Sequence, residues 1–169
     1  MPAQLHEKLE ARPYIRVMSR AFVNEDHFVG DLPDRLVSPH PNHVTERGLE
    51  FIEASLEDSR RAYSEAQSIG DREALAKAAR DVRYWSARRV SAIVTPVLPS
   101  VDAVQFGSAV TIVRDDGRRQ TFRIVGEDEA DPAQGSISHV SPLARALIGK
   151  SVGDTVCAGR DEAEITAIQ

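Results

Sequence analysis

The feature that most constrains this chain is a pair of narrow apolar seams separated by a tight turn. In the first seam, steps of three and four place Leu49, Ile52, Leu56, Ser59, Tyr63 and Ala66 on one helical face. After Gly70 and Asp71 the same spacing returns at Leu75, Ala78, Val82, Trp85, Arg89 and Ala92. Thr45 can cap the first helix, and Pro96 ends the second. The pattern predicts two helices joined as an antiparallel hairpin.

Charged residues occupy most of the other positions in both helices, so neither seam is wide enough to close a globular core. This favours a projecting coiled coil over a compact bundle. Arms of roughly 25 residues would reach on the order of 35 to 40 Å at about 1.5 Å per residue. Tyr63 and Trp85 are expected in the coiled-coil core. The second helix also carries a basic face that can pair with acids of the first helix or meet an acidic partner or RNA: Arg80, Arg83, Arg88 and Arg89.

The period changes to that of strands at Val104, which marks a second unit. Two β-rich runs flank the turn sequence of residues 115–117, and Ser141 with Pro142 begins a short helix that ends before Gly149. The predicted strands are Ala109–Val113, Thr121–Val125, Thr155–Ala158 and Glu164–Ile168. The expected class is therefore α+β, with a helical hairpin followed by a small β-sheet domain that contains one short helix.

Four segments follow from this organisation. Residues 1–42 contain scattered prolines and no sustained period, which predicts an irregular N-terminal arm. Residues 43–95 form the antiparallel coiled-coil hairpin, and residues 96–103, with Pro96 and Pro99, form a linker. Residues 104–169 form the C-terminal domain, which at about 65 residues is large enough to fold alone.

Composition narrows the function classes. Asp and Glu number 26 against 21 Lys and Arg, a net charge of -5, so sequence-specific nucleic acid binding is not expected. Cys157 is the single cysteine and the five histidines lack ligand spacing, so we expect no disulfide, no zinc site and no cofactor. No apolar run is long enough for a membrane span and no signal-peptide pattern opens the chain, which predicts a cytoplasmic protein.

Five segments of the C-terminal unit, in order, resemble the GreA/GreB transcription elongation factor family. They are residues 104–111 (VQFGSAVT), 124–131 (IVGEDEAD), 135–138 (GSIS), 141–150 (SPLARALIGK) and 152–154 (VGD). The resemblance implies an FKBP-like fold for this domain and docking on bacterial RNA polymerase at the rim of its secondary channel, which the coiled coil enters. It assigns the docking contact to the acidic loop and the start of the short helix: Asp128, Glu129, Ala130, Asp131, Pro132, Ser141 and Pro142.

The resemblance also implies a role for acids at the hairpin tip, which in cleavage-stimulating members help hold a second Mg²⁺ in the active site of the polymerase. Asp71 matches the first of these acids. The family tip reads GDLKENAEY, with acids three apart, whereas here Glu73 follows only two residues later and the arms look shorter by about one or two heptads. Without any metal, Asp71 can equally cap the second helix, and Glu73 can be a first-turn acid favoured by the helix dipole.

Three alternative functions are compatible with these sequence features and with the family resemblance. In the first, the chain is a polymerase-binding regulator that is not itself an enzyme and at most stimulates transcript cleavage by the polymerase, whose Mg²⁺ is the only metal involved. In the second, it is a short-armed, non-cleaving competitor of other secondary-channel factors, as the Rnk-like regulators of this group are thought to be. A prolyl isomerase is the third, suggested only by the implied fold, and Phe106 and Phe122 are few aromatics for a proline pocket.

Overall fold

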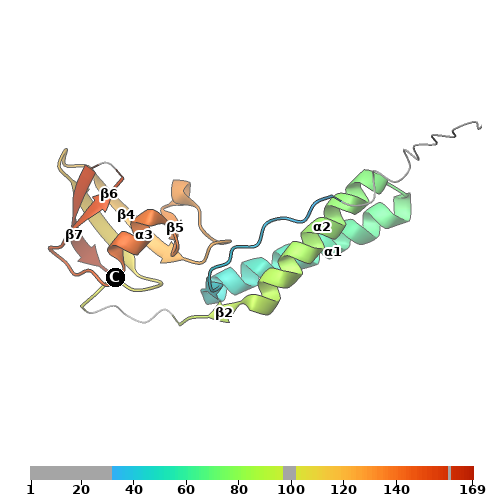
Figure 1. Ribbon diagram of the computed structural model, residues 1–169, viewed down its shortest axis with the longest axis horizontal. Coiled ribbons are helices and arrows are strands. Elements are labelled where there is room, and N and C mark those ends of the chain that lie inside the picture. Colours follow the sequence, from blue (N-terminus) through green and yellow to red (C-terminus); the bar gives the residue numbers. More distant parts are fainter. Residues whose placement is uncertain (1–31, 97–101, 160) are drawn as a thin grey trace, which may run out of the picture.

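A computed structural model of the chain describes residues 32–96, 102–159 and 161–169 (Figure 1). Helix α1 (Glu46–Ile69) and helix α2 (Arg72–Ser91) form an antiparallel hairpin that extends away from a β-sheet domain. Thr45 caps α1 by accepting a hydrogen bond from the Gly48 amide at 2.9 Å. Gly70 ends α1 with a φ of 74°, a left-handed conformation that glycine adopts without strain. The predicted hairpin is confirmed.

The two helices contain 24 and 20 residues, which correspond to lengths of about 36 and 30 Å. Their contact buries few side chains, namely Ile52, Leu56 and Ala66 of α1 and Ala76 and Ala78 of α2. The prediction that Tyr63 is core is wrong, since it is 36% exposed. Trp85 is half-buried and packs edge-on against Phe51 of α1, with ring centroids 5.7 Å apart. Two helices bury only a line of side chains, so large residues remain at its margin.

The seam spacing also predicts Arg89 in the contact between the helices, and the structure corrects this. Its side chain is 47% exposed, and its Nε donates to Glu53 of α1 at 2.6 Å. This contact is the expected pairing between the basic face of the second helix and the acids of the first. Such a pair, exposed on both sides, adds at most about 1 kcal/mol to stability.

A five-stranded sheet with the order β5-β4-β3-β7-β6 forms the second unit. Its strands are β3 (Ala109–Arg114), β4 (Arg119–Val125), β5 (Ser136–Ser138), β6 (Thr155–Ala158) and β7 (Asp161–Ile168). All neighbours are antiparallel except β4 and β5. Helix α3 (Pro142–Leu147) packs on the sheet through Ala144 and Leu147, which belong to a core with Val110, Ile112, Ile124 and Ile165. The predicted α+β class, four predicted strands and the short helix are confirmed.

The sequence did not predict the short elements. β1 (His43–Val44) and β2 (Ile93–Val94) form a two-residue parallel ladder that joins the start and the end of the hairpin at its base. β5 follows a single turn of 3-10 helix, η2 (Pro132–Gln134), after the acidic loop. None of these elements is long enough to produce a readable period.

Residues 32–42, the described part of the N-terminal arm, contain no helix or strand and run along α2 (Figure 1). Asp34 accepts a hydrogen bond from Arg83 at 2.6 Å, and the Arg35 guanidinium lies 3.8 Å from the centre of the Tyr84 ring. The rest of the predicted arm, residues 1–31, lies outside the described residues. Within the described part of the chain, no helix has the length and apolar character needed to cross a membrane.

Candidate functional site at the hairpin tip and the acidic loop

The free end of the hairpin carries both tip acids on exposed positions. Asp71 is the N-cap of α2, and its Oδ1 accepts a hydrogen bond from the Ala74 amide at 3.0 Å. Glu73 lies in the first turn of the same helix, where the helix dipole favours an acid. The capping role considered for Asp71 is therefore present. A carboxylate has about four lone-pair sites, so one capping hydrogen bond leaves oxygen capacity for a metal ion.

The tip acids do not make a metal site by themselves. Across residues 32–96, 102–159 and 161–169, no group of three or more His, Cys, Asp or Glu side chains is placed to hold a metal ion. Mg²⁺ requires near-octahedral oxygen coordination and usually keeps several waters when one or two carboxylates bind it. A partner that already holds the ion would have to supply the remaining ligands.

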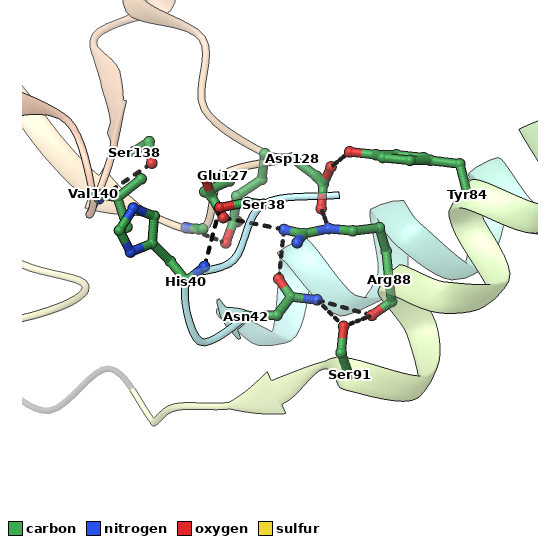
Figure 2. A network of polar contacts seen from close by, with 12 residues as sticks. Ser38, His40, Asn42, Tyr84, Arg88, Ser91, Glu127, Asp128, Ser138 and Val140 are labelled. Carbon is green, nitrogen blue, oxygen red and sulfur yellow. Dashed lines mark hydrogen bonds and ion pairs between the residues drawn. The ribbon is translucent and has the colours of Figure 1, made fainter. Parts of the chain in front are cut away.

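The acidic loop after β4 turns toward the base of the hairpin and meets α2 (Figure 2). Asp128 accepts hydrogen bonds from Arg88 Nε at 2.5 Å and from the Tyr84 hydroxyl at 2.7 Å. Its side chain is only 7% exposed. Burial, followed by the hydrogen bond to Asp128, raises the pKa of Tyr84 from 10.0 to about 12. This predicted docking residue is therefore engaged within the chain.

Arg88 is the buried centre of this contact, with a side chain 2% exposed. Besides Asp128, its guanidinium donates to Asn42 Oδ1 at 2.7 Å and lies 3.6 Å from the Glu127 carboxylate. The Asn42 amide in turn donates to the Arg88 carbonyl at 2.8 Å. A buried guanidinium is tolerated only when charges and acceptors surround it, as they do here. The arm, α2 and the loop thus meet at one residue (Figure 2).

Glu129 makes the matching contact with the other helix. Its carboxylate accepts from the Thr45 amide at 3.0 Å, from the Thr45 hydroxyl at 2.6 Å and from the Gly126 amide at 2.9 Å. Thr45 is the cap of α1, so an acid of the sheet domain adds to the cap of a hairpin helix. A second predicted docking residue is therefore also occupied by contacts within the chain.

Two glycines allow the loop to approach the hairpin this closely. A Cβ on Gly48 would lie 2.3 Å from Glu129 Oε1, and a Cβ on Gly126 would lie 2.7 Å from the His43 carbonyl oxygen. Both separations are far below van der Waals contact. A ring cluster of His43, Phe106 and His139 packs beside them, with centroids 5.6 to 6.1 Å apart. Burial lowers the pKa of His139, and this favours its neutral form in the cluster.

Of the remaining predicted docking residues, three are exposed. Asp131, Pro132 and Pro142 are exposed, and Ala130 and Ser141 are partly exposed. Asp131 caps η2 through the Ala133 amide at 3.0 Å, and Ser141 caps α3 through the Ala144 amide at 3.2 Å. A hollow of about 1070 Å³ lies between the first turns of α1 and the acidic loop, with Arg47, Phe51, Arg123 and Asp131 on its walls. Accessible loop residues therefore adjoin an accessible part of α1.

Sequence reasoning did not single out Arg88 from its basic face, nor Tyr84, Thr45 and Gly48 as contacts of the acidic loop. Arg88 is adjacent to the seam position Arg89, and helical spacing alone does not show which of two neighbouring arginines turns toward another domain. The one available signal was the acidic loop itself, whose charge implies a basic partner.

The fold therefore defines a two-domain protein in which a β-sheet domain carries a helical hairpin with a free acidic tip. Residues 98–168 match the family described as transcription elongation factor, GreA/GreB, C-term. A GreA of Methylobacterium nodulans is 34% identical over 133 residues, which cover 67% of this chain and 84% of that protein. The chain belongs to the GreA/GreB family of transcription elongation factors.

Other similarities cover less or are more distant. The GreB of Neisseria meningitidis serogroup B is 46% identical over 96 residues, which span 53% of this chain and 59% of that GreB. Among solved structures, a GreA/GreB factor from Nitrosomonas europaea is 17% identical with a TM-score of 0.38, over 76% of this chain and 98% of that one. GreA factor homolog 1 of Thermus thermophilus is 21% identical, also with a TM-score of 0.38, over 77% and 99%.

Proposed function

We propose that this protein regulates transcription elongation by binding bacterial RNA polymerase, docking through its C-terminal domain and placing its hairpin at the secondary channel. The observation that carries the proposal is a hairpin of about 36 Å with a free acidic tip, mounted on a domain that matches the GreA/GreB model. The protein supplies no active site of its own in this scheme. It modifies chemistry that belongs to the polymerase.

The accessible residues of the acidic loop and of the start of α3 support a docking surface. Asp131, Pro132 and Pro142 are exposed, and exposed loop residues on a rigid framework are the usual carriers of binding. Their loop adjoins the hollow that Phe51 also lines, and this residue is 47% exposed. A partner that reaches Asp131 can therefore also cover an apolar side chain of α1.

The tip then acts through its carboxylates. Asp71 offers hard oxygen ligands, and such ligands suit a Mg²⁺ that the polymerase already holds. If the tip carboxylate helped to hold that ion, the Mg²⁺ would generate and orient a nucleophilic water for phosphodiester hydrolysis, and cleavage of the transcript by the polymerase would be stimulated. Only one oxygen of Asp71 is used by its capping bond, which is compatible with this role.

A non-cleaving competitor is the second candidate, and two observations favour it. Glu73 follows Asp71 by two residues within the first turn of α2, so the acid spacing of the family tip is not reproduced. The hairpin helices, with 24 and 20 residues, are also short compared with the arms that the family resemblance leads us to expect. A hairpin that ends before the catalytic metal would still occupy the channel and exclude other factors.

Binding and cleavage assays with purified cognate core polymerase test both candidates, the cleavage-stimulating regulator and the non-cleaving competitor. We expect the protein to co-elute with the core enzyme, and absence of co-elution at low salt, where a known secondary-channel factor is retained, would refute the proposal. Stalled complexes are then treated with the wild type and with Asp71→Ala. Cleavage by the wild type that is lost in the variant supports metal assistance. If the wild type gives no cleavage above the intrinsic rate and inhibits another factor, the result supports the competitor. A peptide isomerisation assay that detects no activity excludes the third candidate, a prolyl isomerase.

A further inference from the structure

We propose that Arg88, Asp128 and Glu129 fix the direction of the hairpin relative to the sheet domain and so act as positioning residues for the tip. We call these three residues and Thr45 the interdomain lock. What the tip does rests on the proposed function, whereas the lock itself is a property of the chain alone. The acidic loop then contains two acids that hold the hairpin, Asp128 and Glu129, and an exposed part that is free to meet a partner.

The lock holds the hairpin at two points on different helices. Asp128 is bound by Arg88 and Tyr84 of α2, and Glu129 is bound by Thr45 at the start of α1. One contact would leave the hairpin free to rotate about it, whereas two contacts on separate helices oppose both rotation and tilt. Burial of the Arg88 and Asp128 side chains, 2% and 7% exposed, limits the access of competing water.

The length of the hairpin makes this restraint consequential. Over about 36 Å, a rotation of about 2° at the base moves the tip by about 1 Å, and 10° moves it by about 6 Å. A metal ligand must be held within about 0.5 Å of its productive position. In the element order the chain passes from the hairpin to the sheet domain once, between β2 and β3, and a single covalent connection does not by itself set an angle. Noncovalent contacts at the base therefore have to set it.

The close approach of the loop supports the same assignment. With a side chain at Gly126 the loop could not sit this close to the His43 carbonyl oxygen, and a side chain at Gly48 would displace the Glu129 carboxylate. Gly126 also donates its amide to Glu129. Glu129 is thus held from its own loop and from the hairpin at once. A loop that served docking alone would have no need of these contacts.

The single native cysteine allows a direct measurement on the full chain. Cys157 is exposed on β6, and Ser68→Cys adds a second exposed thiol near the end of α1. Spin labels on these two sites report the distance between the sheet domain and the tip. We expect one narrow distance distribution in the wild-type background. Asp128→Asn and Arg88→Met should broaden or shift it, and Tyr84→Phe, which removes one hydrogen bond, should do so less.

Glu53→Gln is the matched control, because it removes an exposed ion pair with Arg89 on the same hairpin. It should leave the distribution unchanged. Circular dichroism checks that each variant keeps its helices. If Asp128→Asn or Arg88→Met folds poorly, Tyr84→Phe provides the test, because it removes only the hydrogen bond to Asp128 and keeps the aromatic ring. An unchanged distribution in folded Asp128→Asn and Arg88→Met would overturn the lock, whatever the chain binds.

Polymerase assays then test the positioning role. Where the wild type stimulates cleavage, Asp128→Asn should keep its affinity for core polymerase while the stimulated cleavage falls by up to about 100-fold, the cost of about 1 Å of misplacement. A loss of affinity that accounts for the loss of effect would make Asp128 a docking residue and overturn the assignment. A full effect despite a broadened distribution would also overturn it. If wild type fails to bind polymerase, the proposed function fails and the distance measurement still decides the lock.

Discussion

Replacement of Gly48 by alanine gives a prediction in which two physical effects have opposite signs. Gly48 lies in the first turn of α1, where alanine is the better helix former by up to about 1 kcal/mol. The added Cβ would meet Glu129 Oε1 at 2.3 Å and its Cδ at 2.5 Å. The end of a glutamate is flexible and can move away. The cost therefore comes from the hydrogen bonds that it leaves behind.

Glu129 accepts three hydrogen bonds, two from Thr45 and one from Gly126. Hydrogen bonds to a charged group contribute about 1.5 to 3 kcal/mol each. Loss of one or two of them, partly replaced by water, costs about 2 to 4 kcal/mol, which exceeds the gain in helix propensity. We expect Gly48→Ala to lower the free energy of unfolding by about 1 to 3 kcal/mol.

The decisive comparison is a double-mutant cycle with Glu129→Ala. In that background the obstructing carboxylate is absent, so Gly48→Ala should become neutral or stabilising by up to about 1 kcal/mol. Urea denaturation followed by fluorescence of Trp85, the single tryptophan, reports the hairpin because this ring packs on Phe51 of α1. The same sign and size of effect in both backgrounds would refute the reasoning.

Three further predictions concern the lock and the tip. Arg88→Met leaves the buried Asp128 carboxylate without its cation and should lower the free energy of unfolding by about 3 to 5 kcal/mol in denaturant titrations. Asp71→Ala removes the N-cap of α2 and should cost about 1 kcal/mol, whereas an unchanged urea midpoint would show that the cap contributes nothing. The pKa of Tyr84 is raised from 10.0 to about 12, so the stability that its neutral form gives is complete below pH 10 and is lost as the pH rises toward 12. Absorbance titration should show one late-ionising tyrosine that Tyr84→Phe removes, and the variant should lose less stability across that interval.

The elements of the fold were largely accessible from the sequence because their signals are local. The start of α1 at Thr45, the break at Gly70 and the start of α3 at Pro142 each depend on the chemistry of neighbouring residues. The burial of individual hairpin residues was less accessible. Tyr63 and Arg89 satisfy the seam spacing, yet a two-helix contact leaves both at its margin.

The residues of the candidate site also fall into those that the sequence could place and those that it could not. Asp71 and Glu73 could be placed at the tip because a turn between two helices can be read from sequence. The acidic loop could be recognised, but its division into Asp128 and Glu129, which are bound to the hairpin, and exposed Asp131 could not. Whether such an acid faces solvent depends on residues about 40 to 84 positions away, as the separations of Arg88 and Thr45 from their partners show.

The sequence by itself determined two helices with a turn, a small sheet domain and the charge of the loop, since periodicity, caps and turn residues act over a few positions. Only the tertiary structure decided which arginine is buried and which acids it meets. It also decided that Gly48 and Gly126 must be small. These outcomes arise where two separately folded surfaces come together, and the hydrogen bonds, charges and close contacts that form there belong to neither segment alone.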